Sequence, residues 1–227
     1  MQTTTHQGGR TERSTEIKTG TLVADTLRQW IVNGELAPGQ RLIEADLRKS
    51  LDASRSTVRE VLIQLNGEGL VELVHQRGAF VTRLSEKELL DLFGVRERLE
   101  GYAAWLAAKN VAVGQNRKWL KQQQKTWQQA DMSTNYPRHL QENIPFHEGI
   151  LRMSGNDRLV SMLQRLQIPS IRQRFFDAFE PGHWKKSVEE HLGIIDALLA
   201  GDSERAESAM RKHVRRTGKL ASQRVST

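Results

Sequence analysis

A short basic segment is the first feature of this sequence with an evident chemistry. Between residues 48 and 59 the chain reads RKSLDASRSTVR, with four basic residues and one acidic residue. Arginines in the first turn of a helix can reach guanine edges or phosphates in the major groove, and short hydroxyls can contact phosphates or bases. A helix is predicted to begin in this segment. Its candidate DNA contacts are therefore Arg55, Ser56, Thr57 and Arg59.

The alternative interpretation is a solvated helix start, with Ser54 as an N-cap and the arginines facing water. The residues that follow favour DNA. An apolar helix face comes next, and then a hairpin whose tip holds Arg77 and Gly78. In a wing of this kind, glycine lets the backbone approach the minor groove and arginine supplies positive charge.

Three histidines, His147, His191 and His213, fall on three different predicted helices. Apolar residues at helical spacing around His191 and His213 place these two side chains on inward faces. Asn143 precedes His147 by four residues and so shares its face. Three imidazoles in one helical interior can bind a divalent metal such as Zn²⁺ or Ni²⁺. The alternative for each is a core histidine that is hydrogen-bonded to a neighbour.

The basic segment must be positioned by the elements around it. Apolar residues at three- and four-residue spacing predict a helix over residues 21–31, which Asn-Gly and Pro-Gly pairs bring to an end. Two short helices are predicted over residues 44–51 and 56–67. Two β-prone runs, residues 70–74 and 79–81, surround a Gly-containing turn and predict a hairpin. This order of elements is that of a winged helix–turn–helix.

The rest of the chain is predicted to be helical, so the fold class is mainly α. A capping box of Ser85 and Glu88 opens its first helix. Short connections indicate an antiparallel helical bundle. The predicted helices cover residues 85–109, 114–130, 140–153, 158–179 (bent near Pro169), 184–200 and 203–220. The predicted domains are a disordered arm (1–16), the winged helix–turn–helix (17–83) and a helical domain (84–222).

Composition excludes several classes of protein. The 227 residues contain no cysteine, which rules out disulfide scaffolds and thiolate metal sites. No membrane partner is expected because no apolar run reaches about 18 residues. The first residues lack the apolar segment of a secretory signal, so a cytoplasmic protein is expected. The net charge of +7 does not itself argue for nucleic acid, since residues 1–80 hold ten basic and ten acidic residues.

Two sets of motifs resemble a known family. Residues 20–82, through LAPGQRL, SRSTVREVLIQLNGEGLV and QRGAFV, resemble the N-terminal domain of GntR-type bacterial transcription regulators. Residues 85–220, through LFGVRERLE, FHEGILRMSGN and HLGIIDALLAGD, resemble the FCD-type ligand-binding domain of the FadR branch. Six helices suit the VanR-like group of that branch. The resemblance implies a winged DNA-binding domain followed by an effector-binding and dimerisation domain.

The resemblance also implies particular DNA contacts. Matched by position, they fall on Arg55, Ser56, Thr57, Arg59 and the wing residue Gly78. A further family position on the preceding helix is often arginine but is Ala45 here. Arg48 or Lys49 would have to replace that contact.

A metal site is implied as well. FCD domains commonly bind a divalent metal through an Asp and three His, and the matching positions here are Asn143, His147, His191 and His213. Because an Asn oxygen is a neutral donor, we expect a weaker site, or one completed by water or by an effector carboxylate. Pro145 either kinks the helix or begins it, and in the second case Asn143 precedes the helix.

Two further positions bear on the ligand pocket. In related domains an arginine at the position of Arg96 lies near the effector pocket, where it would suit a small carboxylate. The alternative role of Arg96 is an ion pair with Glu100. Trp119 and Trp127 share one amphipathic face, and we expect them in the core or in a dimer surface rather than in a pocket.

These features predict a transcriptional repressor that binds double-stranded operator DNA as a homodimer. A small organic acid in the helical domain would control it, with zinc or nickel as a cofactor. The alternative is a metal-dependent hydrolase or oxygenase that uses the three histidines. That alternative lacks a convincing general base and leaves the winged domain without a role.

Overall fold

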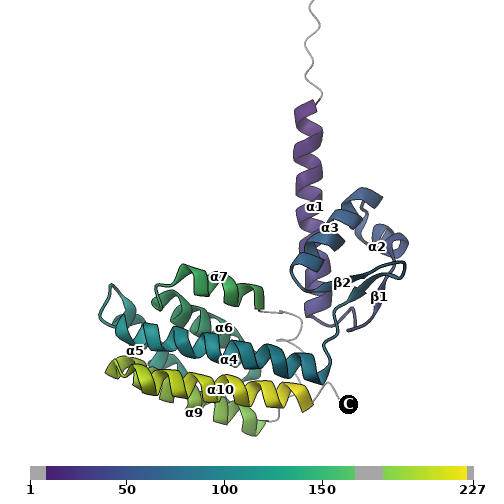
Figure 1. Cartoon of the computed structure of the whole chain (residues 1–227). Helices are drawn as coiled ribbons and strands as arrows, with labels where there is room; N and C mark the ends of the chain where they lie inside the picture. Colours follow the sequence, from purple (N-terminus) through teal and green to yellow (C-terminus); the bar gives the residue numbers. More distant parts are fainter. Residues whose placement is uncertain (1–8, 167–180, 224–227) are drawn as a thin grey trace, which may run out of the picture. The chain divides into compact units, whose positions relative to one another are not determined.

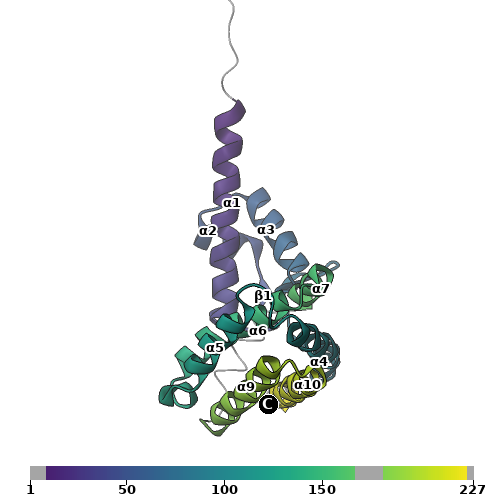
Figure 2. The same ribbon diagram turned by 90° about the vertical axis from the view of Figure 1, so that its left-hand side faces the viewer.

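The computed structural model describes residues 9–166 and 181–223, which form two compact units (Figures 1 and 2). The first unit ends at Arg83 and the second begins at Leu84. Both are rich in helix, so the predicted fold class is confirmed. None of the described helices is both long enough and apolar enough to cross a membrane.

The N-terminal unit is a winged helix–turn–helix, as predicted. Its elements are α1 (Gly9–Val32), β1 (Arg41–Leu42), α2 (Glu44–Leu51), α3 (Arg55–Gly67), β2 (Val71–Val74) and β3 (Gly78–Val81). β2 and β3 form the predicted hairpin, and β1 pairs with the other edge of β3, so the sheet order is β1-β3-β2 with both pairs antiparallel. The sequence did not predict β1, because two residues carry no periodic signal.

One apolar core holds this unit together. Helix α1 packs on α3, and Leu27, Ile31 and Leu65 from these helices are fully buried. The apolar residues of α3 recur on one helix face. Their burial fixes the rotation of α3 and leaves Arg55 and Arg59 exposed on the other side.

Helix α1 begins earlier than the sequence predicts. The predicted arm covers residues 1–16, whereas α1 starts at Gly9. Residues 1–8 lie outside the described residues. The segment that precedes residue 17 is rich in Arg and Glu, which are good helix formers, and this composition lets the helix extend without an apolar face.

The C-terminal unit is a helical bundle, again as predicted. Within the described residues its elements are α4 (Glu86–Lys109), α5 (Asn116–Trp127), the 3₁₀ turn η1 (Ala130–Ser133), α6 (Tyr136–Met153), α7 (Asp157–Leu166), α9 (Pro181–Ala200) and α10 (Ser203–Gln223). The capping box at Ser85 is present. The helix predicted over residues 114–130 ends at Trp127, and η1 follows it. The predicted bend near Pro169 lies outside the described residues.

Pro145 lies inside a helix rather than at its start. Helix α6 begins at Tyr136 and continues through Pro145 to Met153. Of the two positions that the sequence left open for this proline, the structure shows the one inside the helix. Asn143 is therefore helical, one turn before His147 and on the same helix face.

Helices α4 and α10 lie side by side (Figure 1). A Cβ atom at Gly218 would lie 2.5 Å from the Cβ atom of Phe93, so glycine permits this close approach. Between the two helices, buried Glu97 accepts hydrogen bonds from Arg215 at 2.6 and 2.8 Å and from Arg211 at 3.2 Å. The bonds from Arg215 and then Arg211 outweigh burial and lower the pKa of Glu97 to about 2.

Glu97→Gln is expected to lower the free energy of unfolding at pH 7 by about 1–2 kcal/mol, because two arginines lose a charged partner. The pKa of this carboxyl group is lower in the folded protein than in the unfolded chain. Its contribution is therefore complete above the ordinary value of 4.5 and is lost as the pH falls toward 2. Urea unfolding should show a difference between wild type and variant at pH 7 that shrinks below pH 4.5.

Glu189→Gln is the matched control, since it removes an exposed ion pair with Lys186 and should leave stability unchanged. A loss in Glu97→Gln that stays constant from pH 7 down to about pH 3 would contradict the assignment of Glu97.

Candidate nucleic-acid interface and metal centre

The first turn of α3 combines a helix cap with exposed polar side chains. Ser54 is the N-cap, and its Oγ accepts a hydrogen bond from the backbone N–H of Thr57 at 3.1 Å. The same oxygen contacts the hydroxyls of Ser56 and Thr57 at 2.8 and 2.9 Å. Arg55 and Ser56 remain exposed. Capping by Ser54 therefore leaves Arg55 and Ser56 at the surface, where they could contact DNA.

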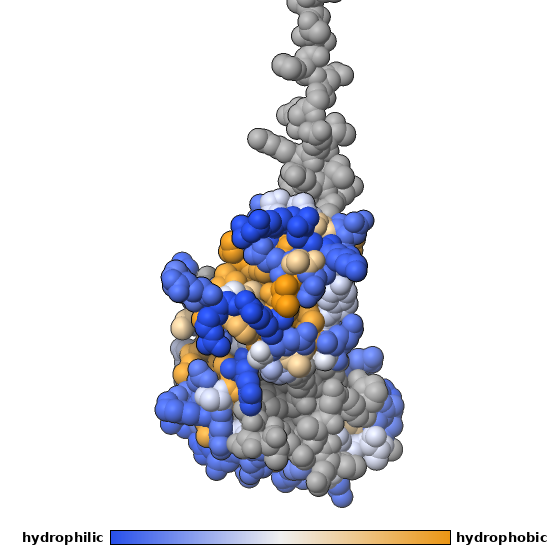
Figure 3. Space-filling view, turned by 90° about the vertical axis from the view of Figure 1, so that its right-hand side faces the viewer, coloured by the Kyte–Doolittle hydropathy of each residue, from blue (hydrophilic) through white to orange (hydrophobic). Residues whose placement is uncertain are grey.

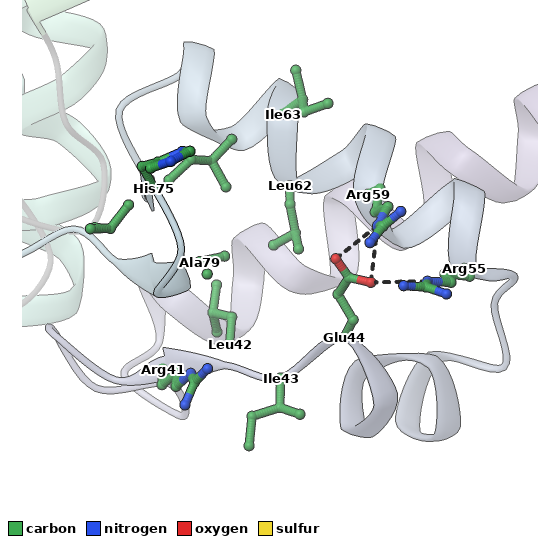
Figure 4. Close-up of a pocket in the computed structure, with 13 residues that line it drawn as sticks. Arg41, Leu42, Ile43, Glu44, Arg55, Arg59, Leu62, Ile63, His75 and Ala79 are labelled. Atoms are coloured by element: carbon green, nitrogen blue, oxygen red, sulfur yellow. Dashed lines mark hydrogen bonds and ion pairs between the residues drawn. The ribbon is translucent and has the colours of Figure 1, made fainter.

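Arg55 and Arg59 converge on one carboxylate that sequence spacing did not predict. The Nε atom of Arg59 is 2.9 Å from Oε1 of Glu44, and that of Arg55 is 3.4 Å from Oε2 (Figure 4). The side chain of Arg55 is still 64% exposed and that of Arg59 is 53% exposed. The hydrogen bond from Arg59 lowers the pKa of Glu44, which is therefore ionised at neutral pH. Glu44 holds the two guanidinium groups side by side at the surface.

A groove of about 870 Å³ lies between α3, β1 and the hairpin (Figure 4). Arg55, Arg59 and Gly78 line it, together with exposed apolar side chains such as Ile63 and Leu73. Figure 3 shows hydrophobic patches among hydrophilic side chains on this unit. Gly78 has a φ of 98°, which favours glycine, so its backbone is open at the groove edge.

The other predicted DNA contacts do not line this groove: Arg48, Ser56 and Arg77 are exposed, and Thr57 is half-buried. Arg48 and Lys49 lie in the last turn of α2. Arg77 lies at the hairpin tip, with its guanidinium 5.5 Å from the centre of the Phe80 ring. Ala45 is also exposed and offers no side-chain donor. The structure thus brings Arg55, Arg59 and Gly78 together and places Arg48 and Arg77 around them on the same unit.

Three histidines meet in the interior of the C-terminal unit. His147 of α6, His191 of α9 and His213 of α10 are buried, and one ligand nitrogen of each lies within 4.8 Å of the others. The Nε2 atoms of His191 and His213 are 3.3 Å apart. Burial keeps the pKa of His191 well below its usual value, so this ring is neutral. Neutral imidazole is the form that ligates metals.

Two of these rings are oriented by carboxylates. Nδ1 of His147 lies 3.0 Å from Oε2 of Glu100, and Nδ1 of His213 lies 2.8 Å from Oε2 of Glu190. Because an ionised carboxylate can only accept, Nδ1 carries a proton in both rings, which leaves Nε2 as the nitrogen that can ligate a metal. Carboxylate–histidine pairs of this kind orient metal ligands and raise their basicity.

Each carboxylate is in turn held by an arginine. Arg96 donates to Oε1 of Glu100 at 3.0 and 2.7 Å, and Arg216 donates to both oxygens of Glu190 at 2.8 and 2.9 Å. Burial would raise the pKa of Glu100, but Arg96 and then His147 hold it well below its usual value. Arg96 thus forms the ion pair that the sequence left open, and its contact with an effector stays a prediction.

The residues present fit a divalent metal. Three imidazole nitrogens, with two anionic carboxylates behind them, form a donor set that suits zinc or nickel. Asn143 is buried on α6, one turn before His147. Its role as a fourth ligand stays a prediction.

A fourth buried histidine, His139, lies beside the cluster and was not predicted. Its ring centroid is 5.9 Å from that of His191 and 4.9 Å from that of Trp184. Burial lowers the pKa of His139 to about 4. Trp127 is fully buried in the core, with its ring 4.2 Å from that of His191. Trp119 is only half-buried and stacks on Phe146.

Two family models match the two units. Residues 19–81 match the bacterial regulatory proteins of the gntR family, and residues 91–216 match the FCD domain. The second match covers more than half of the chain and contains all three clustered histidines. The chain belongs to the GntR family of bacterial regulators.

Relatives of this GntR regulator are transcriptional regulators. A helix–turn–helix-type transcriptional regulator in an unstable DNA locus of Streptomyces ambofaciens is 34% identical over 192 residues, which cover 83% of this chain and 79% of the relative. A probable D-xylose utilization operon transcriptional repressor of Paenarthrobacter nicotinovorans is 29% identical over 200 residues, which cover 86% of this chain and 87% of the relative. The protein is therefore a transcriptional regulator, and the alternative of a metal-dependent enzyme is set aside.

Solved structures share the fold of this GntR regulator. Escherichia coli McbR/YncC matches 91% of this chain and 98% of its own, with a TM-score of 0.70 and 22% identity. A GntR transcriptional regulator from Rhodococcus sp. RHA1 matches 90% and 97%, with a TM-score of 0.69 and 23% identity. At these identities the likeness shows the fold alone.

Proposed function

We propose that this regulator is a repressor whose binding to double-stranded operator DNA is controlled by a small organic acid in the FCD domain. The observation that carries the proposal is the buried convergence of His147, His191 and His213, two of them oriented by carboxylates. Two relatives named as repressors, at 29% and 26% identity, support repression rather than activation. Another relative, at 29% identity, is the Glc operon transcriptional activator of Escherichia coli.

Residues 17–83 are proposed as the DNA-binding domain. The N-terminal turn of α3 would enter the major groove, and the wing would approach the minor groove. Arg55 and Arg59 would exchange Glu44 for base edges or phosphates. The proposed contacts are Arg48, Arg55, Ser56, Thr57, Arg59, Arg77 and Gly78.

Residues 84–222 are proposed as the effector-binding and dimerisation domain. His147, His191 and His213 would hold zinc or nickel, and Asn143 would add a weak neutral donor. A bound metal supplies positive charge that can accept a carboxylate oxygen of the effector. Arg96 would add a second cation near that carboxylate.

A homodimer is proposed because the surfaces of two neighbouring helices of this domain carry exposed apolar side chains. Val95 and Tyr102 on α4 and Met162 on α7 are 50%, 45% and 55% exposed, and the two helices pack against each other. A second copy would cover this surface. Two winged domains would then read a pseudo-palindromic operator with half-sites about one helical turn apart. The effector would shift the population between dimers that bind DNA and dimers that do not.

The test uses an operator that the protein itself selects from random DNA, followed by fluorescence anisotropy at fixed salt. We expect at least one small mono- or dicarboxylate to weaken operator binding by roughly tenfold or more in zinc-loaded protein. The same acid should have little effect on metal-free protein, and its uncharged amide should have none. If no acid changes binding with or without zinc, the effector proposal fails. If no sequence is enriched, the operator proposal fails.

A further inference from the structure

Beside the three-histidine cluster, four buried polar atoms have no hydrogen-bond partner within the part of the chain that the structure describes. They are Nδ1 of His191, Nε2 of His139, Nε1 of Trp127 and Oε1 of Gln123. Buried polar atoms are rarely left in this state, and such exceptions call for a bound group or an ordered water. The proposed metal site uses none of these atoms, since His191 would ligate through Nε2.

The four atoms belong to neighbouring side chains. The ring centroid of Trp127 lies 4.2 Å from that of His191 and 5.1 Å from that of His139. The centroids of His139 and His191 are 5.9 Å apart. Gln123 is buried one turn before Trp127 on α5. Helices α5, α6 and α9 therefore bring the four groups to one region of the interior.

Two of these atoms can accept a hydrogen bond and two can donate one. Nδ1 of His139 lies 3.1 Å from the carbonyl oxygen of Met132, so Nδ1 carries the proton. A second proton would create a buried cation without a counter-charge, so Nε2 of His139 can only accept. Oε1 of Gln123 is also an acceptor. Nε1 of Trp127 donates, and so does Nδ1 of His191 when its Nε2 keeps a lone pair for a metal.

We infer that Gln123, Trp127, His139 and His191 form a hydroxyl-binding subsite of the effector pocket. An alcohol oxygen accepts a hydrogen bond from Trp127 or His191 and donates its own proton to His139 or Gln123. A carboxylate can only accept, and it would meet two acceptors there. The inference rests on the proposed function, which assigns the effector's carboxylate to the metal side of His191. The effector class is then a hydroxylated carboxylic acid.

The test uses pairs of acids that differ by one hydroxyl: glycolate and acetate, lactate and propionate, malate and succinate. Each is titrated calorimetrically into zinc-loaded protein. We expect the hydroxylated member of at least one pair to bind roughly 10- to 100-fold more tightly. His139→Phe keeps an aromatic ring but removes the acceptor, so it should bind both members equally and retain its zinc affinity. Trp127→Phe removes a donor and should lose the preference in the same way.

Trp184→Phe is the matched control, because Trp184 contacts the His139 ring but does not supply any of the four atoms. It should keep the preference for the hydroxylated acid. Equal binding of both members by wild type overturns the subsite and leaves the carboxylate proposal standing. Binding of no acid at all overturns the subsite together with the proposed effector site. A preference that survives in both His139→Phe and Trp127→Phe overturns the assignment of these residues.

Discussion

Arg55→Ala combined with Arg59→Ala is expected to weaken operator binding by about 100- to 10,000-fold. An arginine at a base edge or a phosphate contributes about 1–3 kcal/mol, and this variant removes two of them. In the structure both side chains are more than half exposed and share Glu44 as their partner. DNA therefore has to replace a single surface carboxylate, which costs little. Fluorescence anisotropy on the selected operator, at one fixed salt concentration, measures the change.

The control for this variant must lose the same charge elsewhere. Lys118 and Arg205 are exposed on the C-terminal unit. Replacing both with alanine also removes two positive charges, and we expect operator affinity to stay within about threefold of wild type. If the Arg55/Arg59 variant binds no more weakly than this control while its thermal unfolding is unchanged, α3 does not read the operator.

The winged unit was largely predictable because most of its elements carry a local signal. In α3, Val58, Leu62 and Leu65 recur at helical spacing and are all buried. Gly78 follows the turn of the hairpin and begins β3. Strand β1 carries no such signal, because its two residues become a strand only by pairing with β3 far along the chain. Glu44 was missed for the same reason, since its contact with Arg59 depends on how α2 and α3 fold together.

The helical unit shows where periodicity stops being informative. Apolar spacing indicates that a histidine faces inward, but it does not show that three inward faces meet at one point. The resemblance to FCD domains supplied that step. The carboxylates could not be predicted at all, since Glu100 is 47 residues from His147 and Glu190 is 23 residues from His213.

His139 could have been found from the sequence. His139, Asn143 and His147 are spaced by four residues, so they share one face of α6. His139, the first member of this series, lies outside the ligand positions that the resemblance implies. Every polar residue on a buried helix face needs a partner, whether or not a known motif includes it.

His213→Ala is expected to lower the zinc affinity of the protein by at least about 100-fold, because it removes one of three ligand nitrogens. The buried carboxylate behind it is not left alone, since Glu190 keeps its ion pair with Arg216 at 2.8 Å. The variant should therefore remain folded. Competition with a chromophoric zinc chelator measures the affinity, and urea unfolding of metal-free protein checks the fold.

A graded series separates a metal centre from three core histidines that merely pack together. Glu190→Gln keeps all three rings but removes the carboxylate that orients His213, and we expect a loss of about 10- to 100-fold in zinc affinity. His75→Ala, exposed in the N-terminal unit, should leave zinc affinity unchanged. If His213→Ala binds zinc as tightly as wild type does, the cluster is only core packing. An acidic effector would then need a different cation, although Arg96 is already engaged by Glu100.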